Sequence, residues 1–233
     1  MKIAIMQPYL FPYIGYFQLI NAVEEFVIYD NIEYSKKGWI NRNRILANAK
    51  DIYISIPLKK ESDYLDIKDR HLAENWPLER GKVINKIIEN YKKSPFYKSV
   101  FPLIENCFFF ENENLFEFIK NSIFQINNYL NIKTPIYSSS SISNNRLLKS
   151  HHRVIEICKI RGANIYINPI GGVNLYSKNV FINNNIDLSF LKSNDIVYRQ
   201  FENKFVPSLS IIDVLMFNSR TEIRELLNQY ELV

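Results

Sequence analysis

The first forty-four residues constrain the fold more than any other stretch of the chain. Residues 2–6 form an apolar run typical of a short strand, residues 7–12 form a proline-containing loop, and residues 13–22 carry a helical pattern. A second apolar run, residues 26–29, ends at Asp30. Strand, loop, helix and strand in this order open a βαβ unit, and open α/β sheets bind ligands outside the carboxyl ends of their strands. We therefore expect Gln7 and Asp30 to lie at one ligand-binding edge.

The rest of the chain continues this alternation. Short apolar runs begin near residues 25, 134, 164 and 195, residues 52–56 and 64–67 alternate like strands, and the helical period dominates residues 76–130. The pattern predicts an α/β, Rossmann-like fold with a mostly parallel sheet of about five strands and helices on both faces. We expect a single α/β domain over residues 1–233, with a helical subdomain or insertion at about residues 76–130.

Four polar loops follow the predicted strands, at residues 7–11, 30–39, 138–145 and 169–174. In a parallel sheet all four meet at one edge, which makes this edge the candidate site. Gly171 and Gly172 lack a Cβ and so allow backbone N–H groups to approach a phosphate, with Asn174 just beyond them. An ordinary turn explains the same glycines equally well.

A dense polar block follows Trp39. On a strand, Asn41 and Asn43 share one face while Arg42 and Arg44 share the other. Guanidinium groups bind phosphate in a bidentate manner, amides suit sugar hydroxyls, and the Trp39 indole stacks on a base or sugar. The alternative is a solvated hairpin with a basic face.

Three residues are candidate general bases at this edge. His152 and His151 follow the loop at 138–145, and Asp30 ends a strand. Asn144 or Asn145 can cap the helix predicted there. Leu147 and His151 lie on its apolar stripe, which also suits a core histidine, whereas His152 lies on its flank. Asp30 suits a turn equally well. The third histidine, His71, lies in a charged turn where we expect it to be solvated.

The composition argues against several classes of protein. The formal charge of +5 is spread along the chain and forms no basic arm for nucleic acid. Cys107 and Cys158 lack metal-ligand spacing, so we expect buried thiols, and no metal. We expect neither a signal peptide nor a membrane span, and hence a cytoplasmic protein.

Several motifs resemble one known family. They are residues 6–17 (MQPYLFPYIGYF), 39–44 (WINRNR), 87–97 ending in YKKSPFY, 169–172 (PIGG) and 209–213 (LSIID). Together these resemble the WbqC-like family over nearly the whole chain. The resemblance implies an enzyme of bacterial surface-polysaccharide (O-antigen, lipopolysaccharide) biosynthesis, and it adds Tyr9 and Tyr16 to the candidate substrate-binding residues.

The segment from Tyr13 to Tyr16 also resembles the His-x-Gly-His element of nucleotidylyltransferases, with tyrosine at both histidine positions. A phenol cannot act as a phosphate-binding cation, so the replacement of both histidines by tyrosine puts ATP chemistry in doubt.

We therefore expect a transferase that acylates a nucleotide-linked amino sugar, with acyl-CoA or ATP as compatible co-substrates and a homodimer left open. The alternatives are a nucleotidyltransferase-like or adenylate-forming ligase, and a non-catalytic sugar-nucleotide binding protein.

Overall fold

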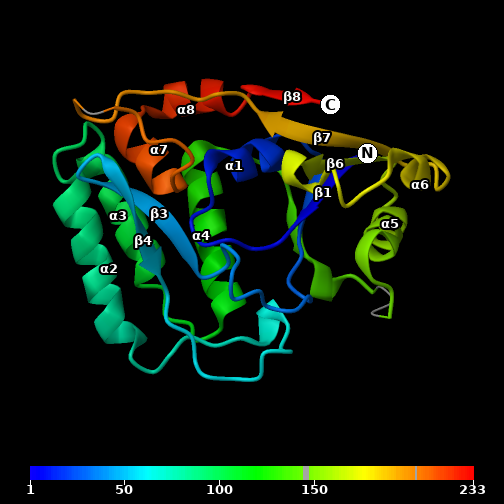
Figure 1. The fold of residues 1–233 in the computed structure, drawn as a ribbon, viewed down its shortest axis with the longest axis horizontal. Helices are drawn as coiled ribbons and strands as arrows, with labels where there is room; N and C mark the ends of the chain where they lie inside the picture. Colours follow the sequence, from blue (N-terminus) through cyan, green and yellow to red (C-terminus); the bar gives the residue numbers. More distant parts are fainter. Residues whose placement is uncertain (144–146, 203) are drawn as a thin grey trace.

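A six-stranded sheet in the order β5-β2-β1-β6-β7-β8 forms the centre of the protein (Figure 1). The computed structural model describes residues 1–143, 147–202 and 204–233. The first five strands in this order run parallel, and β8 pairs antiparallel with β7. Their bounds are β1 Lys2–Met6, β2 Glu25–Ile28, β5 Ile136–Ser138, β6 Ile165–Pro169, β7 Asp187–Ser193 and β8 Tyr230–Leu232. The predicted α/β fold with a mostly parallel sheet is confirmed.

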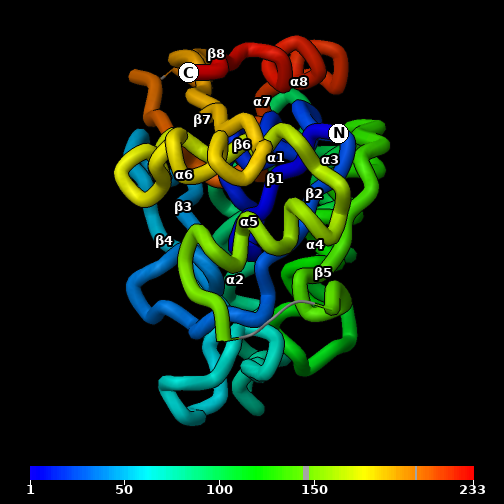
Figure 2. The backbone as a smooth tube through the Cα atoms, turned by 90° about the vertical axis from the view of Figure 1, so that its right-hand side faces the viewer, coloured from blue at the N-terminus to red at the C-terminus, as the bar shows by residue number. Residues whose placement is uncertain are grey.

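Side chains that alternate along the strands build a separate core on each face of the sheet. Ile3 and Ile5 of β1 join the core that includes helix α5 (Ser150–Ile160) and Phe181 of α6 (Lys178–Ile182). Ala4 joins the opposite core with α1 (Ile14–Asn21). Figure 2 shows α5 and α6 in front of the sheet strands. Because a parallel sheet is stable only when both faces are covered, this arrangement explains the near-continuous apolar strands.

Three helices form the middle of the chain, as predicted for residues 76–130. They are α2 (Trp76–Tyr91), α3 (Tyr97–Phe108) and α4 (Leu115–Leu130), and they share one apolar core with α1 and the C-terminal helices α7 (Ile211–Phe217) and α8 (Arg220–Leu226). The Asn114 side chain accepts a hydrogen bond from the Glu117 N–H and caps the start of α4.

A β-hairpin stands apart from the main sheet. Strands β3 (Arg42–Ala47) and β4 (Lys50–Ser55) pair antiparallel through a two-residue turn at Asn48 and Ala49, which both have positive φ. The hairpin contacts α2 and α7 (Figure 1). The strand predicted at residues 64–67 is wrong: Asp66 makes only an isolated bridge to Glu33, and a short 3-10 helix, η1 (Ile67–Asp69), follows.

The strand predicted at residues 196–200 is also wrong, because the fifth parallel strand is β7 at residues 187–193. Ile196 and Gln200 are buried and Tyr198 is half-buried, whereas Val197 and Arg199 are exposed. The segment has this alternation without pairing to a neighbouring strand. The Tyr198 hydroxyl and the Gln200 amide both donate hydrogen bonds to the buried Asp213 carboxylate of α7. Period-two burial therefore arose here without sheet pairing.

The helix predicted around His151 begins later than its apolar stripe indicated. It starts at Ser150, after Leu147, which is fully outside the helix and exposed. The predicted capping residues Asn144 and Asn145 lie outside the described residues. The helix ends at Ile160, close to Gly162 as expected, and Gly162 has a φ of 69°, the left-handed conformation that glycine adopts at little cost.

Candidate functional site at the carboxyl edge of the sheet

The loop that follows β1 is fixed by the Trp39–Arg44 block. The Asn43 side-chain amide donates hydrogen bonds to the carbonyls of Leu10 (2.9 Å) and Phe11 (2.8 Å). The Ser210 hydroxyl donates a second bond to the Phe11 carbonyl, and the Leu10 N–H donates to Ile40. These bonds hold Phe11 at a φ of 41°, which is unusual for a bulky residue. The chain therefore leaves β1 in one defined path.

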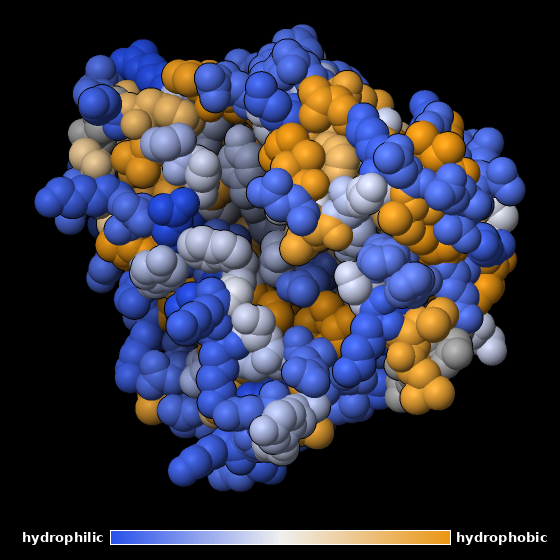
Figure 3. All heavy atoms as spheres, turned by 45° about the vertical axis from the view of Figure 1, so that its right-hand side comes forward, coloured by the Kyte–Doolittle hydropathy of each residue, from blue (hydrophilic) through white to orange (hydrophobic). Residues whose placement is uncertain are grey.

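Three cavities meet at Tyr9 of this loop. We call them the sheet-edge cavity (about 320 Å³), the α1 cavity (about 240 Å³) and the hairpin cavity (about 220 Å³), and Tyr9 lines all three. The molecular surface turned forward in Figure 3 is hollowed near its centre, and both hydrophobic and hydrophilic residues border the hollow. Because the three cavities share Tyr9, we treat them together as one candidate site.

The sheet-edge cavity lies between the ends of β1, β2 and β6. It combines amide and phenol groups with apolar side chains: its lining comprises Ile5, Met6, Gln7, Tyr9, Tyr29, Ile32, Asn168, Pro169, Gly171, Gly172, Leu175 and Tyr176. Burial raises the pKa values of Tyr29 and Tyr176 above the ordinary value, so both phenols stay protonated and can donate hydrogen bonds at neutral pH.

The two glycines after β6 have different roles. A Cβ at Gly172 would lie 1.8 Å from the Asn168 side-chain nitrogen, whereas a Cβ at Gly171 would meet no heavy atom within 4 Å. Gly172 is therefore explained by the packing of Asn168, and only Gly171, in the 3-10 helix η3 (Ile170–Gly172), leaves open space beside the cavity. Asn174 is exposed and lines none of the three cavities.

The hairpin cavity carries the positive charge of the site. Trp39 and Tyr53 stack with their planes 14° apart, and the Arg44 guanidinium lies 5.4 Å from the Trp39 ring centre. Arg44 lines the cavity together with Tyr9, Pro12, Tyr13, Trp39, Asn43 and Ser208. Arg42 also lies over Trp39 and Tyr53, but it donates to the carbonyls of Lys37 and Gly38 and does not line the cavity.

The side-chain amides of the two asparagines in this block form hydrogen bonds within the protein. Asn43 is buried and holds the loop at residues 10–11, as described above. Asn41 accepts a hydrogen bond from the Tyr34 hydroxyl and donates to the Ile56 carbonyl, and it lies outside the three cavities. Its amide is thus occupied within the protein.

The carboxylate of Asp30 is buried and joins β2 to the chain after β5. It accepts hydrogen bonds from the hydroxyls of Ser139 and Ser140 and from the Ser140 N–H, all in the short 3-10 helix η2 (Ser139–Ser141). Asp30 is 1% exposed and lines none of the three cavities. This geometry is that of a structural carboxylate.

The two histidines of α5 lie at the flank of the site. Their ring centres are 4.1 Å apart, with His151 half-buried and His152 exposed. The next residue, Arg153, donates to the Asn31 carbonyl, and its guanidinium lies 5.2 Å from the ring centre of Tyr29, which lines the sheet-edge cavity. The first turn of α5 therefore borders the site without lining it.

The structure brings eight of the predicted site residues to the three cavities: Gln7, Tyr9, Tyr16, Trp39, Asn43, Arg44, Gly171 and Gly172. The predicted site residues did not include Tyr13, Tyr29, Asn168 and Tyr176, although the resemblance of residues 13–16 to a nucleotide-binding element pointed to Tyr13, and the position just before Asp30 pointed to Tyr29. Among the described residues that line these cavities, none is an Asp, a Glu or a His.

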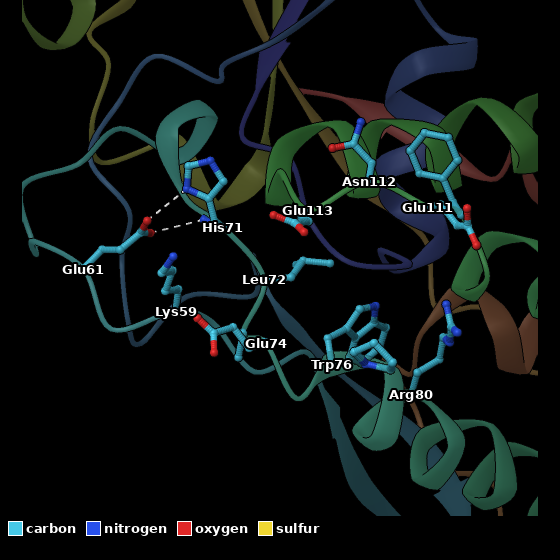
Figure 4. A pocket seen from close by; sticks show the side chains of 13 residues that line it. Lys59, Glu61, His71, Leu72, Glu74, Trp76, Arg80, Glu111, Asn112 and Glu113 are labelled. Atoms are coloured by element: carbon cyan, nitrogen blue, oxygen red, sulfur yellow. Dashed lines mark hydrogen bonds and ion pairs between the residues drawn. The ribbon is translucent and has the colours of Figure 1, made fainter.

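A larger cavity, about 640 Å³, lies elsewhere and shares no lining residue with these three. It contains a pair in which His71 Nδ1 lies 2.9 Å from a Glu61 oxygen (Figure 4). Burial of Glu61 opposes its ionisation, but the hydrogen bonds from His71 hold its pKa below the ordinary value. The sequence predicted a solvated His71, whereas its side chain is only half-exposed and is paired with Glu61. The charged residues that line this cavity, such as Lys59 and Glu113, are exposed, so water and salt weaken their attraction for a ligand. We therefore place the candidate site at the sheet edge.

Within residues 1–143, 147–202 and 204–233, no group of three or more His, Cys, Asp or Glu side chains could hold a metal ion. Cys107 and Cys158 are buried, and burial raises both thiol pKa values to about 12. In the same described ranges, no helix combines the length and the apolar composition that a membrane crossing requires.

Comparison with known proteins gives one family. The model of the WbqC-like protein family matches residues 7–225. The uncharacterized protein Rv1507c of Mycobacterium tuberculosis is 24% identical over 227 residues, which cover 95% of each chain. No solved structure gives a significant match. The family match includes the loop after β1, the hairpin and the end of β6, which together build the three cavities. The chain belongs to the WbqC-like protein family.

Proposed function

We propose that this protein is a cytoplasmic transferase that acylates the amine of a nucleotide-linked amino sugar used for surface polysaccharide. One observation carries the proposal: three cavities of different chemistry meet at Tyr9. One is cationic and aromatic, one is rich in neutral hydrogen-bonding groups, and one is apolar. A nucleotide-linked sugar and an acyl group together present these three kinds of surface.

The hairpin cavity suits the nucleotide diphosphate. The Arg44 guanidinium pairs with Asp51 and donates to the Ser208 carbonyl, and its Nε has no partner among the described residues. Its remaining N–H groups can form charge-assisted hydrogen bonds with phosphate oxygens. The Trp39 indole, which is 36% exposed, offers a face on which a base can stack. The neighbouring Arg42 adds positive charge without entering the cavity, which strengthens the attraction for an anionic ligand.

The sheet-edge cavity suits the sugar. The Gln7 amide and the Tyr29 and Tyr176 phenols line it, and these neutral groups match the donors and acceptors of sugar hydroxyls. Apolar atoms of Met6 and Leu175 complete the wall, as is usual for small-molecule sites that place a few polar groups in an apolar surround.

In the proposed reaction the sugar amine attacks the carbonyl carbon of an acyl thioester. A C–N bond forms, the C–S bond breaks, the amine loses a proton to a base, and the departing thiolate takes up a proton. Asp30 is fully engaged with Ser139 and Ser140, so the base comes from the first turn of α5, with His152 favoured over the less exposed His151.

The test is a turnover assay on the purified protein. It offers a panel of nucleotide-linked amino sugars with short-chain acyl-CoA, or with a free acid and ATP, and detects the acylated sugar by mass spectrometry. We expect product with acyl-CoA and none without it. Nucleotide transfer from ATP, or product that requires ATP, would contradict the proposal. Tyr13 and Tyr16 stand where the His-x-Gly-His element has its two histidines. A phenol carries no positive charge at any pH, and burial raises both pKa values, so these two residues are neutral and supply no cation for a triphosphate.

A second function is favoured by a different observation. Because no carboxylate or imidazole is among the described residues that line the three cavities, the same groove suits a protein that binds a nucleotide-linked sugar without reacting with it. Tight binding of the sugar nucleotide without turnover of any donor would support this second function over the first.

A further inference from the structure

The α1 cavity differs from its two neighbours because its lining is almost entirely apolar. Helix α1 contributes Gly15, Tyr16 and Leu19, the loop before it contributes Tyr9, Pro12 and Tyr13, and the sheet side contributes Met6, Pro169, Ile170, Leu191 and Ser193. Its volume of about 240 Å³ equals that of roughly eight water molecules in the liquid. An apolar cavity of this size accommodates a short aliphatic chain, and it opens beside the cavity that we assign to the sugar.

Tyr16 lines this cavity and carries a hydroxyl without a hydrogen-bond partner among the described residues. Tyr16 is 7% exposed, and the hydroxyl itself is buried. Buried hydroxyls are nearly always hydrogen-bonded, since an unmade bond leaves the group without compensation for lost water. Because this phenol stays protonated, it can donate to an oxygen atom of a ligand once the side chains that cover the hydroxyl move aside.

We propose that the α1 cavity binds the acyl group that is transferred. The ligand is a short, unbranched acyl chain whose carbonyl oxygen accepts a hydrogen bond from the Tyr16 hydroxyl. During attack by the sugar amine this oxygen becomes negative, so the same bond strengthens in the transition state and lowers the barrier. The inference rests on the proposed acyl transfer and adds the class of donor and the residues that select it.

Two substitutions in α1 change the size of the cavity in opposite directions. A Cβ at Gly15 meets the Tyr13 ring at 3.3 Å, so Gly15→Ala narrows the cavity while improving helix propensity. Leu19 is 1% exposed, and Leu19→Ala enlarges the cavity. Ile20 is equally buried in the same helix but does not line the cavity, so Ile20→Ala is a matched control for any loss of stability.

The experiment measures binding and transfer of acetyl-, butyryl- and octanoyl-CoA by the wild type and these variants. Calorimetry gives binding without acceptor, and the assay with amino sugar gives turnover. We expect the preferred chain to become shorter in Gly15→Ala, longer in Leu19→Ala and unchanged in Ile20→Ala. Tyr16→Phe, which keeps the ring, should lower turnover by about 100-fold or more at an unchanged chain-length preference.

The outcomes separate this inference from the proposed function. Transfer of acyl groups with the same chain-length preference in all variants overturns the inference and leaves the acyl-transfer function standing. Binding that shifts with cavity size but gives no transfer supports the cavity assignment and overturns the proposed reaction. Neither binding nor transfer of any acyl-CoA by the wild type overturns both.

Discussion

The side chain of Asn168 fills the space that a Cβ would need at Gly172. The Asn168 nitrogen lies 1.8 Å from that position, and Asn168 is buried with its side-chain oxygen held by the Tyr166 hydroxyl. The end of β6 and the turn after it are therefore packed together as one unit beside the sheet-edge cavity.

This relationship predicts different effects for two neighbouring glycines. Gly172→Ala should lower the free energy of unfolding by about 1–3 kcal/mol, since Asn168 must leave its position. Gly171→Ala meets no atom and should leave stability unchanged. Denaturant unfolding of both variants measures this, and equal stability of the two would contradict the assigned packing.

Asn43 is predicted to control the site through the loop after β1. Asn43→Ala removes two hydrogen bonds to the carbonyls of Leu10 and Phe11, so we expect a loss of about 2 kcal/mol in the free energy of unfolding. Since Tyr9 precedes this loop anchor, binding of a sugar nucleotide should weaken as well. Asn41→Ala, which removes bonds away from the cavities, serves as the control: it should lower stability without weakening binding by the folded protein.

Asp30 is predicted to stabilise the fold and to take no part in proton transfer. Asp30→Ala leaves the Ser139 and Ser140 donors without their charged partner, and we expect the free energy of unfolding to fall by about 3 kcal/mol. A variant that unfolds like the wild type but has lost turnover would restore Asp30 as a base.

The histidine prediction concerns turnover at preserved fold. A positioned base contributes about 10²–10⁴-fold to the rate, so His152→Asn should reduce turnover by this factor while leaving the melting temperature unchanged. His151 is half-buried, and His151→Asn should mainly reduce stability. Full turnover in both variants would remove these histidines from the mechanism.

The parallel sheet was predictable because the apolar runs of β1, β2 and β6 have few polar interruptions and end at loops. Strand β7 was missed for a physical reason: residues 196–200 show the burial pattern of a strand, because the side chains of Tyr198 and Gln200 reach the buried Asp213 from a segment outside the sheet. Sequence periodicity reports which side chains are buried, and it does not report which backbone they pair with.

Only those residues of the site that follow a recognisable strand could be predicted from the sequence. Gln7 and Gly171 follow recognisable strands, so their place at the sheet edge could be inferred. Tyr29 and Asn168 belong to the same cavity only because β1 lies between β2 and β6. This strand order depends on long-range pairing, which no local pattern in the sequence encodes.

Calorimetric titration with a nucleotide-linked amino sugar tests the central claim most directly, because two arginines in different cavities give opposite predictions. Arg44 lines the hairpin cavity, and Arg80 lines the cavity of about 640 Å³ that contains Glu61 and His71. Arg44→Ala should weaken binding by about 10- to 100-fold through loss of a charge-assisted hydrogen bond, while Arg80→Ala should bind like the wild type. The Arg44 ion pair with Asp51 is partly exposed, so the melting temperature should change little. Binding that survives Arg44→Ala and is lost in Arg80→Ala would contradict the account and place the site in the other cavity.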